Sequence, residues 1–300
     1  MGKIFRFNPL RSRIRKRRII AILIITLPFW SWLFWYLQKP KVINIMIFDK
    51  TVPVLKRNEH RSFNWVLTHH KYVKPDKNLY DINKDYKGFF PLEPAKSEKY
   101  ELHDLENFTE TQIDSTADAL DMFYYTDSYG VYYNEWYRHR NETEHSEYIY
   151  GGLSDNECTL IEKMVERKKL IISEFNFFAS PTPYILRKRM EQLLDIRWTG
   201  WTARYFDLLD TVKNPELPRW VVKLYKEQHN YKWPFKKAGI VFVHIDNTIE
   251  ILENETNLTQ ETPYIYTNDY AQKKYNLPHS IHYPYWMDIT YSGPNNRVIS

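Results

Sequence analysis

Cysteine and glycine are scarce in this sequence, and each shortage excludes a class of site. The 300 residues contain one cysteine, Cys158, so an intramolecular disulfide and a cysteine-built zinc site are both impossible. Cys158 stands among the helix-forming residues 155–163, which favours a structural role over that of a thiol nucleophile. The eight glycines form no Gly-rich phosphate loop, and neither the Gly-x-Ser-x-Gly elbow nor the His-Glu-x-x-His helix occurs. We therefore expect neither nucleotide-dependent chemistry nor a bound cofactor.

Acidic residues are absent from the first 18 positions, which carry eight basic side chains. The whole chain has 42 lysines and arginines, so 34 remain beyond residue 18 against 37 acids, a net charge of −3. The positive charge of the protein thus belongs to its amino-terminal tail. A nucleic-acid-binding body is not indicated, and we expect no nucleic acid partner.

Charge of either sign is missing from residues 19–37. About twenty apolar residues cross a hydrocarbon core of roughly 30 Å. The basic block before them predicts a cytoplasmic amino terminus, and Trp30, Trp32, Trp35 and Tyr36 suit an interfacial aromatic belt at the far end. A cleaved signal peptide is the alternative, but its apolar core is usually shorter and small residues follow it. We predict a basic cytoplasmic tail (1–18), a single-pass membrane anchor (19–38) and an extracytoplasmic α/β domain (39–300).

Apolar runs alternate with helical patterns in the first part of this domain. Residues 42–48, 119–126 and 170–173 read as buried strands, and 59–70 as a helix. Ser154 followed by Glu157 predicts a capped helix that runs to about residue 168. A further helix is expected after Pro183, while residues 71–118 read as an insertion or several short elements. This order favours an open, mostly parallel sheet with insertions.

The second part is less regular. The residues between Asp195 and Asp210 read as an aromatic-basic loop, and residues 217–229 as a helix. Residues 238–245 and 249–252 predict a hairpin, with weaker strands at 264–266 and 283–290. No convincing linker divides residues 41–300.

Polar side chains follow the predicted strands at the place where open α/β sheets bind ligands. Glu174 and Asn176 follow the third strand and point to one side of an extended chain. Glu174 suits a general acid or base, or a nucleophile toward an anomeric carbon, and glycoside hydrolysis needs a second carboxylate. The acids available for that role after other apolar runs are Asp127, Glu135, Asp49 and Asp246. The alternative is that these acids cap helices or bind loop amides.

We take Glu174 and Asp127 as the candidate catalytic residues. The candidate substrate-binding residues are Asn176, Asp49, Tyr129, Glu135, Trp201, Arg204 and Asp246. The segment with Trp198, Trp201, Arg204 and Tyr205 suits an aromatic wall with an anion-binding guanidinium, although a packing cluster explains it equally well. His244 with Asp246, and His279 with His282, are spaced too loosely to predict a metal site.

Residues 151–194 resemble the class I glutamine amidotransferase-like arrangement of the flavodoxin-like superfamily. The shared features are Gly151-Gly152-Leu153, a capped helix, the strand 170–173, a turn and another helix. In that superfamily the turn is a nucleophile elbow. Here Glu174, Phe175 and Asn176 occupy the turn, so no Cys-His-Glu triad can be carried over and glutaminase activity by that route is rejected. The resemblance implies a fold and a site position, as in relatives that handle carbohydrates.

Two functions fit these observations. The first is a membrane-anchored protein that hydrolyses or modifies a glycan of the cell envelope or an exopolysaccharide. The second is a non-catalytic subunit that holds a glycan or a protein partner in an envelope assembly. The abundance of Tyr and Trp suits sugar stacking, although biased codon usage explains it as well.

Overall fold

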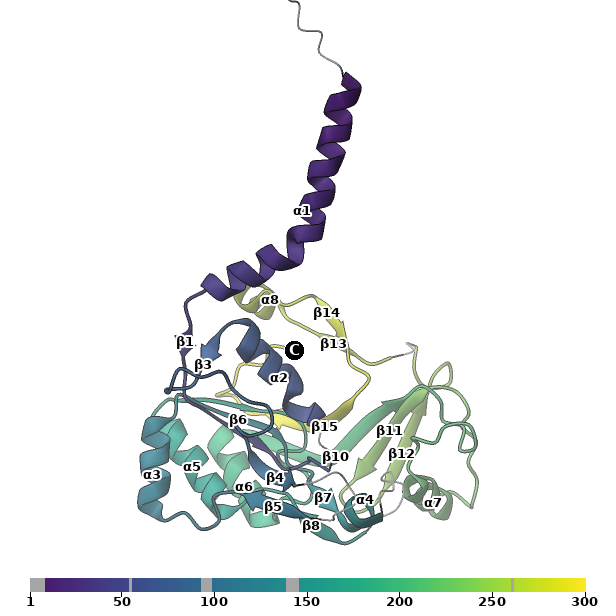
Figure 1. The fold of residues 1–300 in the computed structure, drawn as a ribbon. Coiled ribbons are helices and arrows are strands. Elements are labelled where there is room, and N and C mark those ends of the chain that lie inside the picture. The colour runs from purple at the N-terminus through teal and green to yellow at the C-terminus, as the bar shows by residue number, and fades with distance from the viewer. Residues whose placement is uncertain (1–8, 54–55, 93–98, 139–145, 260–261) are drawn as a thin grey trace, which may run out of the picture.

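The structure is a computed structural model that describes residues 9–53, 56–92, 99–138, 146–259 and 262–300. Its first element is the long helix α1 (Pro9–Leu37), which projects from the body of the protein and bends part-way along its length (Figure 1). Pro28 lies inside α1, and proline is a common cause of such bends. Residues 1–8 of the predicted basic tail, and the side chains of residues 9–17, lie outside what the structure describes.

Within α1, the segment Ile20–Leu37 is long and apolar enough to cross a membrane. Its 18 residues span about 27 Å at 1.5 Å per residue. None of this segment is buried against the body. The apolar amino-terminal helix predicted from the sequence is therefore present.

The body is built on a five-stranded sheet with the order β5-β4-β2-β6-β9. The strands are β2 (Ile45–Asp49), β4 (Lys87–Pro91), β5 (Tyr100–His103), β6 (Met122–Asp127) and β9 (Leu170–Ser173). β2, β4, β6 and β9 are parallel, whereas the edge strand β5 is antiparallel. After β2 the chain adds β4 and β5 on one side and then crosses to add β6 and β9 on the other. The order therefore reverses between β2 and β6, where open α/β sheets form a ligand crevice.

Helices cover both faces of this sheet (Figure 1). Alternate side chains of a strand point to opposite faces, so Ile45 and Ile47 pack with Leu67 of α2 (Asn58–His69). Phe48 and Phe123 face the other way, toward α3 (Glu110–Ala119), α5 (Asp155–Glu166) and α6 (Tyr184–Leu194). Each large apolar side chain buried in this way contributes about 1.5–3 kcal/mol.

The beginning of α5 confirms the capping box predicted from the sequence. The Ser154 hydroxyl accepts from the backbone N–H of Glu157, and the Glu157 carboxylate accepts from the backbone N–H of Ser154. These two bonds satisfy amide groups that the helix itself leaves unpaired. They also fix the position of the Glu157 side chain on the face of the sheet that α5 covers.

A second, four-stranded antiparallel sheet has the order β12-β11-β10-β15. Its strands are β10 (Ile196–Phe206), β11 (Gly239–His244), β12 (Ile249–Glu253) and β15 (Trp286–Ser292), and α7 (Arg219–Gln228) packs on it. The predicted hairpin is confirmed as β11 and β12. The predicted aromatic-basic loop is wrong, because those residues form β10, whose pairing with β15 shifts between Trp198 and Thr202. This irregularity interrupts the two-residue alternation that marks a strand.

Short elements complete the body. They are β1 (Lys41–Val42), β3 (Tyr72–Val73), β7 (Val131–Tyr132), α4 (Tyr133–Arg138), β8 (Tyr148–Tyr150), β13 (Tyr264–Tyr266), α8 (Asp269–Tyr275) and β14 (Ser280–His282). Residues 71–118 indeed contain several short elements rather than one long loop. The expected α/β architecture with a mostly parallel sheet is confirmed, while the separate antiparallel sheet was not foreseen.

Candidate functional site

The site lies where β2, β6 and β9 end side by side. Asp49, the last residue of β2, pairs in register with Asp127, the last residue of β6. Glu174 follows the last residue of β9, and its N–H donates to the carbonyl of Tyr125. The structure therefore brings together three of the acids that the sequence singled out.

Asp49 is fully buried and contacts His60, which lies in the first turn of α2. Its Oδ2 atom is 2.5 Å from Nδ1 of His60, and its Oδ1 atom accepts from the N–H of Thr51 at 3.1 Å. Burial raises the pKa of Asp49, and the hydrogen bond and charge of His60 oppose this shift. The carboxyl group of Asp49 therefore links the end of β2 to the beginning of α2.

The other ring nitrogen of His60 is also occupied. Nε2 lies 3.0 Å from the carbonyl oxygen of Ile82, which can only accept, so Nε2 carries a proton. One further proton is shared between Nδ1 and Asp49. Both nitrogens of this buried ring are therefore used within the protein, and His60 positions Asp49 rather than meeting a ligand.

Gly88 on β4 permits the close packing of the backbone beside Asp49. Its φ angle is +130°, and a Cβ atom added there would lie 1.9 Å from the carbonyl oxygen of Asp49. No residue with a side chain fits this conformation and this contact. Glycine at this position is a requirement of the site.

Lys50 points to the opposite face of the sheet from Asp49. Its ammonium group lies 2.8 Å from Oε1 of Glu157 and donates to the carbonyl of Gly152 at 2.7 Å. The Tyr125 hydroxyl donates to the same carboxylate at 3.2 Å. This buried network ties the end of β2 to the beginning of α5.

Asp127 keeps part of its surface open, unlike Asp49. Its Oδ1 atom accepts from the N–H of Tyr129 at 2.7 Å. Burial, together with the negative charges of Asp49 and Glu59, raises the pKa of Asp127 to about 8, although the hydrogen bond from Tyr129 opposes the shift. Asp127 therefore combines a raised pKa with a partly exposed position.

Glu174 is exposed and lies on the same side of the sheet as α2. The hydroxyl of buried Tyr124 donates a short hydrogen bond to Oε1 of Glu174. The ring of Tyr124 stacks on Phe63 of α2 with centroids 3.9 Å apart. Burial and this hydrogen bond both raise the pKa of Tyr124, so the phenol stays a donor. Tyr124 thereby orients one oxygen of Glu174.

Asn176 is a turn residue whose polar groups bind the protein. Its φ angle is +66°, its side-chain amide donates to the carbonyl of Ser180, and its carbonyl accepts from Ser128. Its N–H donates to Asp288 of β15 at 2.7 Å. Burial raises the pKa of Asp288 to about 6, against the hydrogen bonds from Asn176 and Thr202. This contact joins the two sheets.

Aromatic packing continues this junction. The ring of Phe175 stacks on Trp286 with centroids 5.9 Å apart, and the Arg204 guanidinium lies 5.4 Å from the same indole. Arg204 also forms an ion pair with Glu216 at 2.7 Å. Of the residues predicted to form an aromatic wall, Arg204 contacts this cluster, whereas Trp201 packs on His244.

The remaining predicted residues lie in other settings. Trp201 packs on His244, whose Nδ1 is 2.8 Å from Asp246 in the turn between β11 and β12. The Thr248 amide and His244 lower the pKa of exposed Asp246 to about 2. Glu135 lies in α4 and accepts from the N–H of Tyr132 at 3.3 Å. None of these contacts joins Asp246 or Glu135 to Glu174.

The described residues offer neither a cluster of metal ligands nor a reactive thiol. Over the described ranges, no group of three or more His, Cys, Asp or Glu side chains is placed to hold a metal ion. Cys158 is buried in the core, and burial raises the pKa of its thiol to about 12. This is the structural role expected from the sequence.

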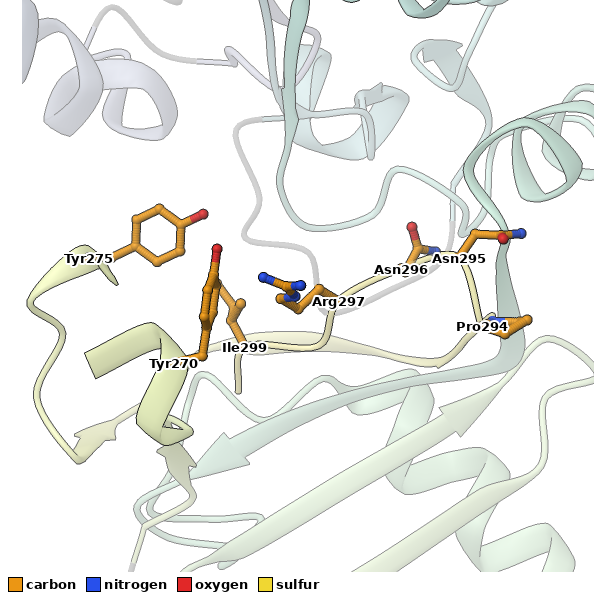
Figure 2. A pocket seen from close by; sticks show the side chains of 7 residues that line it. All are labelled: Tyr270, Tyr275, Pro294, Asn295, Asn296, Arg297 and Ile299. Carbon is orange, nitrogen blue, oxygen red and sulfur yellow. The ribbon is translucent and has the colours of Figure 1, made fainter. Parts of the chain in front are cut away.

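A surface hollow lies at the carboxyl-terminal end of the chain, where Figure 2 shows Tyr270, Tyr275 and Arg297 around it. Its volume is about 470 Å³, and Arg297 lies 4.3 Å from the ring of Tyr270. The hollow is lined by no residue from the ends of β2, β6 or β9. None of the predicted site residues contributes to it.

Four polar residues that contact the ends of these strands were missed in the sequence: Lys50, His60, Glu157 and Asp288. Glu157 was identified only as part of a helix cap, and His60 only as part of the predicted helix 59–70. Lys50 immediately follows Asp49 after an apolar run, and this polar, charged position at a strand end was the available signal. Asp288 had none, because its partner Asn176 is 112 positions away.

Comparison with protein-family models, with curated proteins and with solved structures finds no match to this chain.

Proposed function

We propose that this chain is a membrane-anchored protein that hydrolyses or otherwise modifies a glycan outside the cytoplasm. Asp127 and Glu174 are the catalytic pair in this proposal. The observation that carries it is the contrast between these two carboxyl groups. The pKa of Asp127 is raised to about 8, and Glu174 lies exposed just after the neighbouring strand β9.

Asp127 is assigned as the general acid. Its proton is retained at neutral pH, and its side chain is reachable, so it can protonate the oxygen of a leaving group. Pairs of carboxyl groups whose surroundings separate their pKa values are the usual acid and base of glycoside chemistry. The charge of buried Asp49 contributes to the raised pKa of Asp127.

Glu174 is assigned as the base or nucleophile. Asp127 pairs with Asp49 at the strand ends, and Tyr124 of the same strand as Asp127 binds Glu174. Neighbouring strands lie about 4.8 Å apart. Carboxyl groups separated by roughly 5–10 Å flank the bond that a glycosidase cleaves.

Binding of the sugar is assigned to the aromatic cluster beside Glu174. Trp286 and Phe175 offer ring faces for stacking, and Arg204 lies over the same indole. Tyr129 lies two residues after Asp127, to which its N–H donates, and is assigned to the opposite side of the bound sugar. Asp49 and Asn176 are positioning residues, since their polar groups are bound within the protein.

The membrane placement is part of the proposal. The apolar length of Ile20–Leu37 supports a single-pass anchor. The eight basic residues before it support a cytoplasmic amino terminus and an extracytoplasmic body. A glycan at the cell envelope is then the available substrate, and assembly proteins of that envelope are the available partners.

The strand order supports a distant flavodoxin-like relation. In that arrangement the parallel strands follow the order 2-1-3-4, and β4-β2-β6-β9 repeats this order. The reversal between β2 and β6 then marks the ligand crevice. The antiparallel edge strand and the second sheet are additions to that plan.

The test is a substrate screen with the full chain in lipid nanodiscs. Neutral, acidic and amino-sugar oligosaccharides carrying a fluorescent reducing-end label are incubated with it, and the products are separated and weighed by mass spectrometry. We expect a new product from at least one class, absent with an Asp127→Asn, Glu174→Gln double variant. Binding of a labelled glycan without any product, equal in both proteins, would instead support a non-catalytic glycan-binding subunit.

A further inference from the structure

The end of the apolar helix α1 is fastened to the body rather than joined to it by a free linker. The indole N–H of Trp35 donates to the carbonyls of Thr68 and His69, at 3.2 and 3.0 Å. These carbonyls belong to the last turn of α2, where a helix lacks intrahelical donors, and the Thr68 carbonyl also accepts from the backbone N–H of Lys71. The last turn of α1 therefore completes the end of α2.

Lys71 strengthens this attachment. Its ammonium group donates to the carbonyls of Tyr36 and Gln38, at 2.6 and 3.0 Å. The same group lies 4.7 Å from the ring of Trp35 and 5.4 Å from that of Tyr36. Immediately after α1, the short strand β1 pairs with β3, which follows α2. The body thus has one orientation relative to the end of α1.

An aromatic side chain stands open next to this attachment. Trp65 of α2 is 62% exposed, and its ring stacks on His69 with centroids 4.8 Å apart. The neighbouring Val66 is 39% exposed. Exposure of a large indole to water is unfavourable, whereas Trp side chains concentrate at membrane–water interfaces. Trp65 lies one helical turn before His69, whose carbonyl accepts from Trp35. This position places Trp65 level with the aromatic end of α1, where the membrane–water interface is expected.

We propose that the face formed by Trp65, Val66, His69 and Lys71, here called the docking face, rests in the interfacial layer of the bilayer that α1 crosses. This inference depends on the proposed membrane anchor and not on the proposed glycan chemistry. Its occupant is a lipid surface, because the face continues directly from the aromatic end of the apolar helix. Lys71 suits lipid phosphate groups at the same depth.

The docking face has a consequence for the site. One helix, α2, carries His60 near its beginning and the docking face at its end. The nine residue steps from His60 to His69 correspond to about 14 Å along the helix axis. Asp49, which His60 holds, therefore lies close to the bilayer, and the crevice meets ligands at the membrane surface.

The sole cysteine is buried, so cysteine labelling can test the docking face cleanly. Single cysteines are introduced as Trp65→Cys and Val66→Cys, and Val212→Cys serves as the control because Val212 is 91% exposed and lies in the segment after β10. Ile25→Cys, 77% exposed on α1, reports on the anchor. Each full-length variant is labelled with an environment-sensitive fluorophore in phosphatidylcholine vesicles. Quenching by lipids with a nitroxide near the headgroup or deep in the acyl chain is then measured.

We expect headgroup-level quenching at positions 65 and 66 to exceed that at position 212 at least threefold, with deep quenching at position 25. Quenching at 65 and 66 equal to that at 212, with deep quenching retained at 25, would overturn the docking face alone. Loss of deep quenching at position 25 would overturn the anchor and the docking face together. Agreement between positions 65 and 66 guards against a local effect of replacing Trp65.

Discussion

Asp49 and His60 form a buried pair whose Oδ2 and Nδ1 atoms lie 2.5 Å apart, with at most 1% of either side chain exposed. The pair joins the end of a parallel strand to the first turn of the helix that covers it. The second nitrogen of His60 is held by the Ile82 carbonyl, so the histidine is fixed from both sides. The end of β2 is therefore fixed to the beginning of α2 by a buried polar link.

Removal of His60 tests this link. We expect His60→Ala to lower the free energy of unfolding by about 3–5 kcal/mol, because the buried carboxyl of Asp49 loses its partner. Asp49→Ala combined with His60→Ala should cost less than the sum of the single changes, a coupling that thermal unfolding of the four proteins measures. Glu101→Gln, which breaks the exposed pair with His103, is the control and should have little effect. Additive losses would contradict a specific pair.

A second substitution at Glu157 should restore stability lost when its partner Lys50 is replaced. Lys50→Met leaves the buried Glu157 carboxylate without its cation and should cost about 3–5 kcal/mol in chemical unfolding. Adding Glu157→Gln should restore most of this loss, because the amide oxygen still caps the N–H of Ser154 and no buried charge remains. A double variant that is less stable than Lys50→Met would show that the ion pair itself is not the determinant.

Asp127 predicts a pH dependence of stability. Its pKa in the folded protein is about 8, above the ordinary value of 3.8, so the folded state binds this proton more tightly than the unfolded state. The resulting stability is fully present below about pH 4 and is lost as the pH rises through 8.

Asp127→Asn removes this titration. The variant should exceed the native chain in stability at pH 9 by roughly 1–3 kcal/mol, since each pKa unit corresponds to 1.36 kcal/mol and contact with solvent reduces the full shift. Asp207→Asn, at an exposed position, is the control. Parallel stability curves for the native and Asp127→Asn proteins between pH 4 and 9 would exclude a raised pKa.

Gly88 predicts a steric effect at the same crevice. Gly88→Ala places a Cβ atom 1.9 Å from the Asp49 carbonyl in a backbone conformation that alanine rarely adopts. We expect a loss of about 3 kcal/mol or more in stability, measured by thermal unfolding. Ser115→Ala, on the exposed side of α3, should change the midpoint by no more than a degree or two. An equally small effect at position 88 would show that β4 can move away from β2.

The sequence predicted those parts of the fold that local patterns encode. The strand at residues 170–173 and the Ser154–Glu157 cap appear as expected, because periodicity and capping act over a few residues. The acids at strand ends were also found, since their position follows from the strand itself. Asp49, Asp127 and Glu174 come together because their strands are neighbours.

Other features depend on contacts that the sequence does not reveal. The strand β10 was mistaken for a loop because an irregular register hides its alternation. Asp288 meets Asn176 only through the packing of the two sheets. Asp49 is buried against His60, whereas Asp127 is partly exposed and has a raised pKa. This difference arises from the surroundings of the two residues and not from residue type.

The most direct test of the proposed function is the pH dependence of kcat/KM on the glycan identified in the screen. The native chain should lose activity as the pH rises through about 8, because Asp127 must carry its proton to act as the acid. Asp127→Asn and Glu174→Gln should each lower kcat at least 100-fold, while Asp207→Asn and Glu250→Gln, both at exposed positions, retain it. Full activity of Glu174→Gln, or a profile with no loss near pH 8, would contradict the assignment.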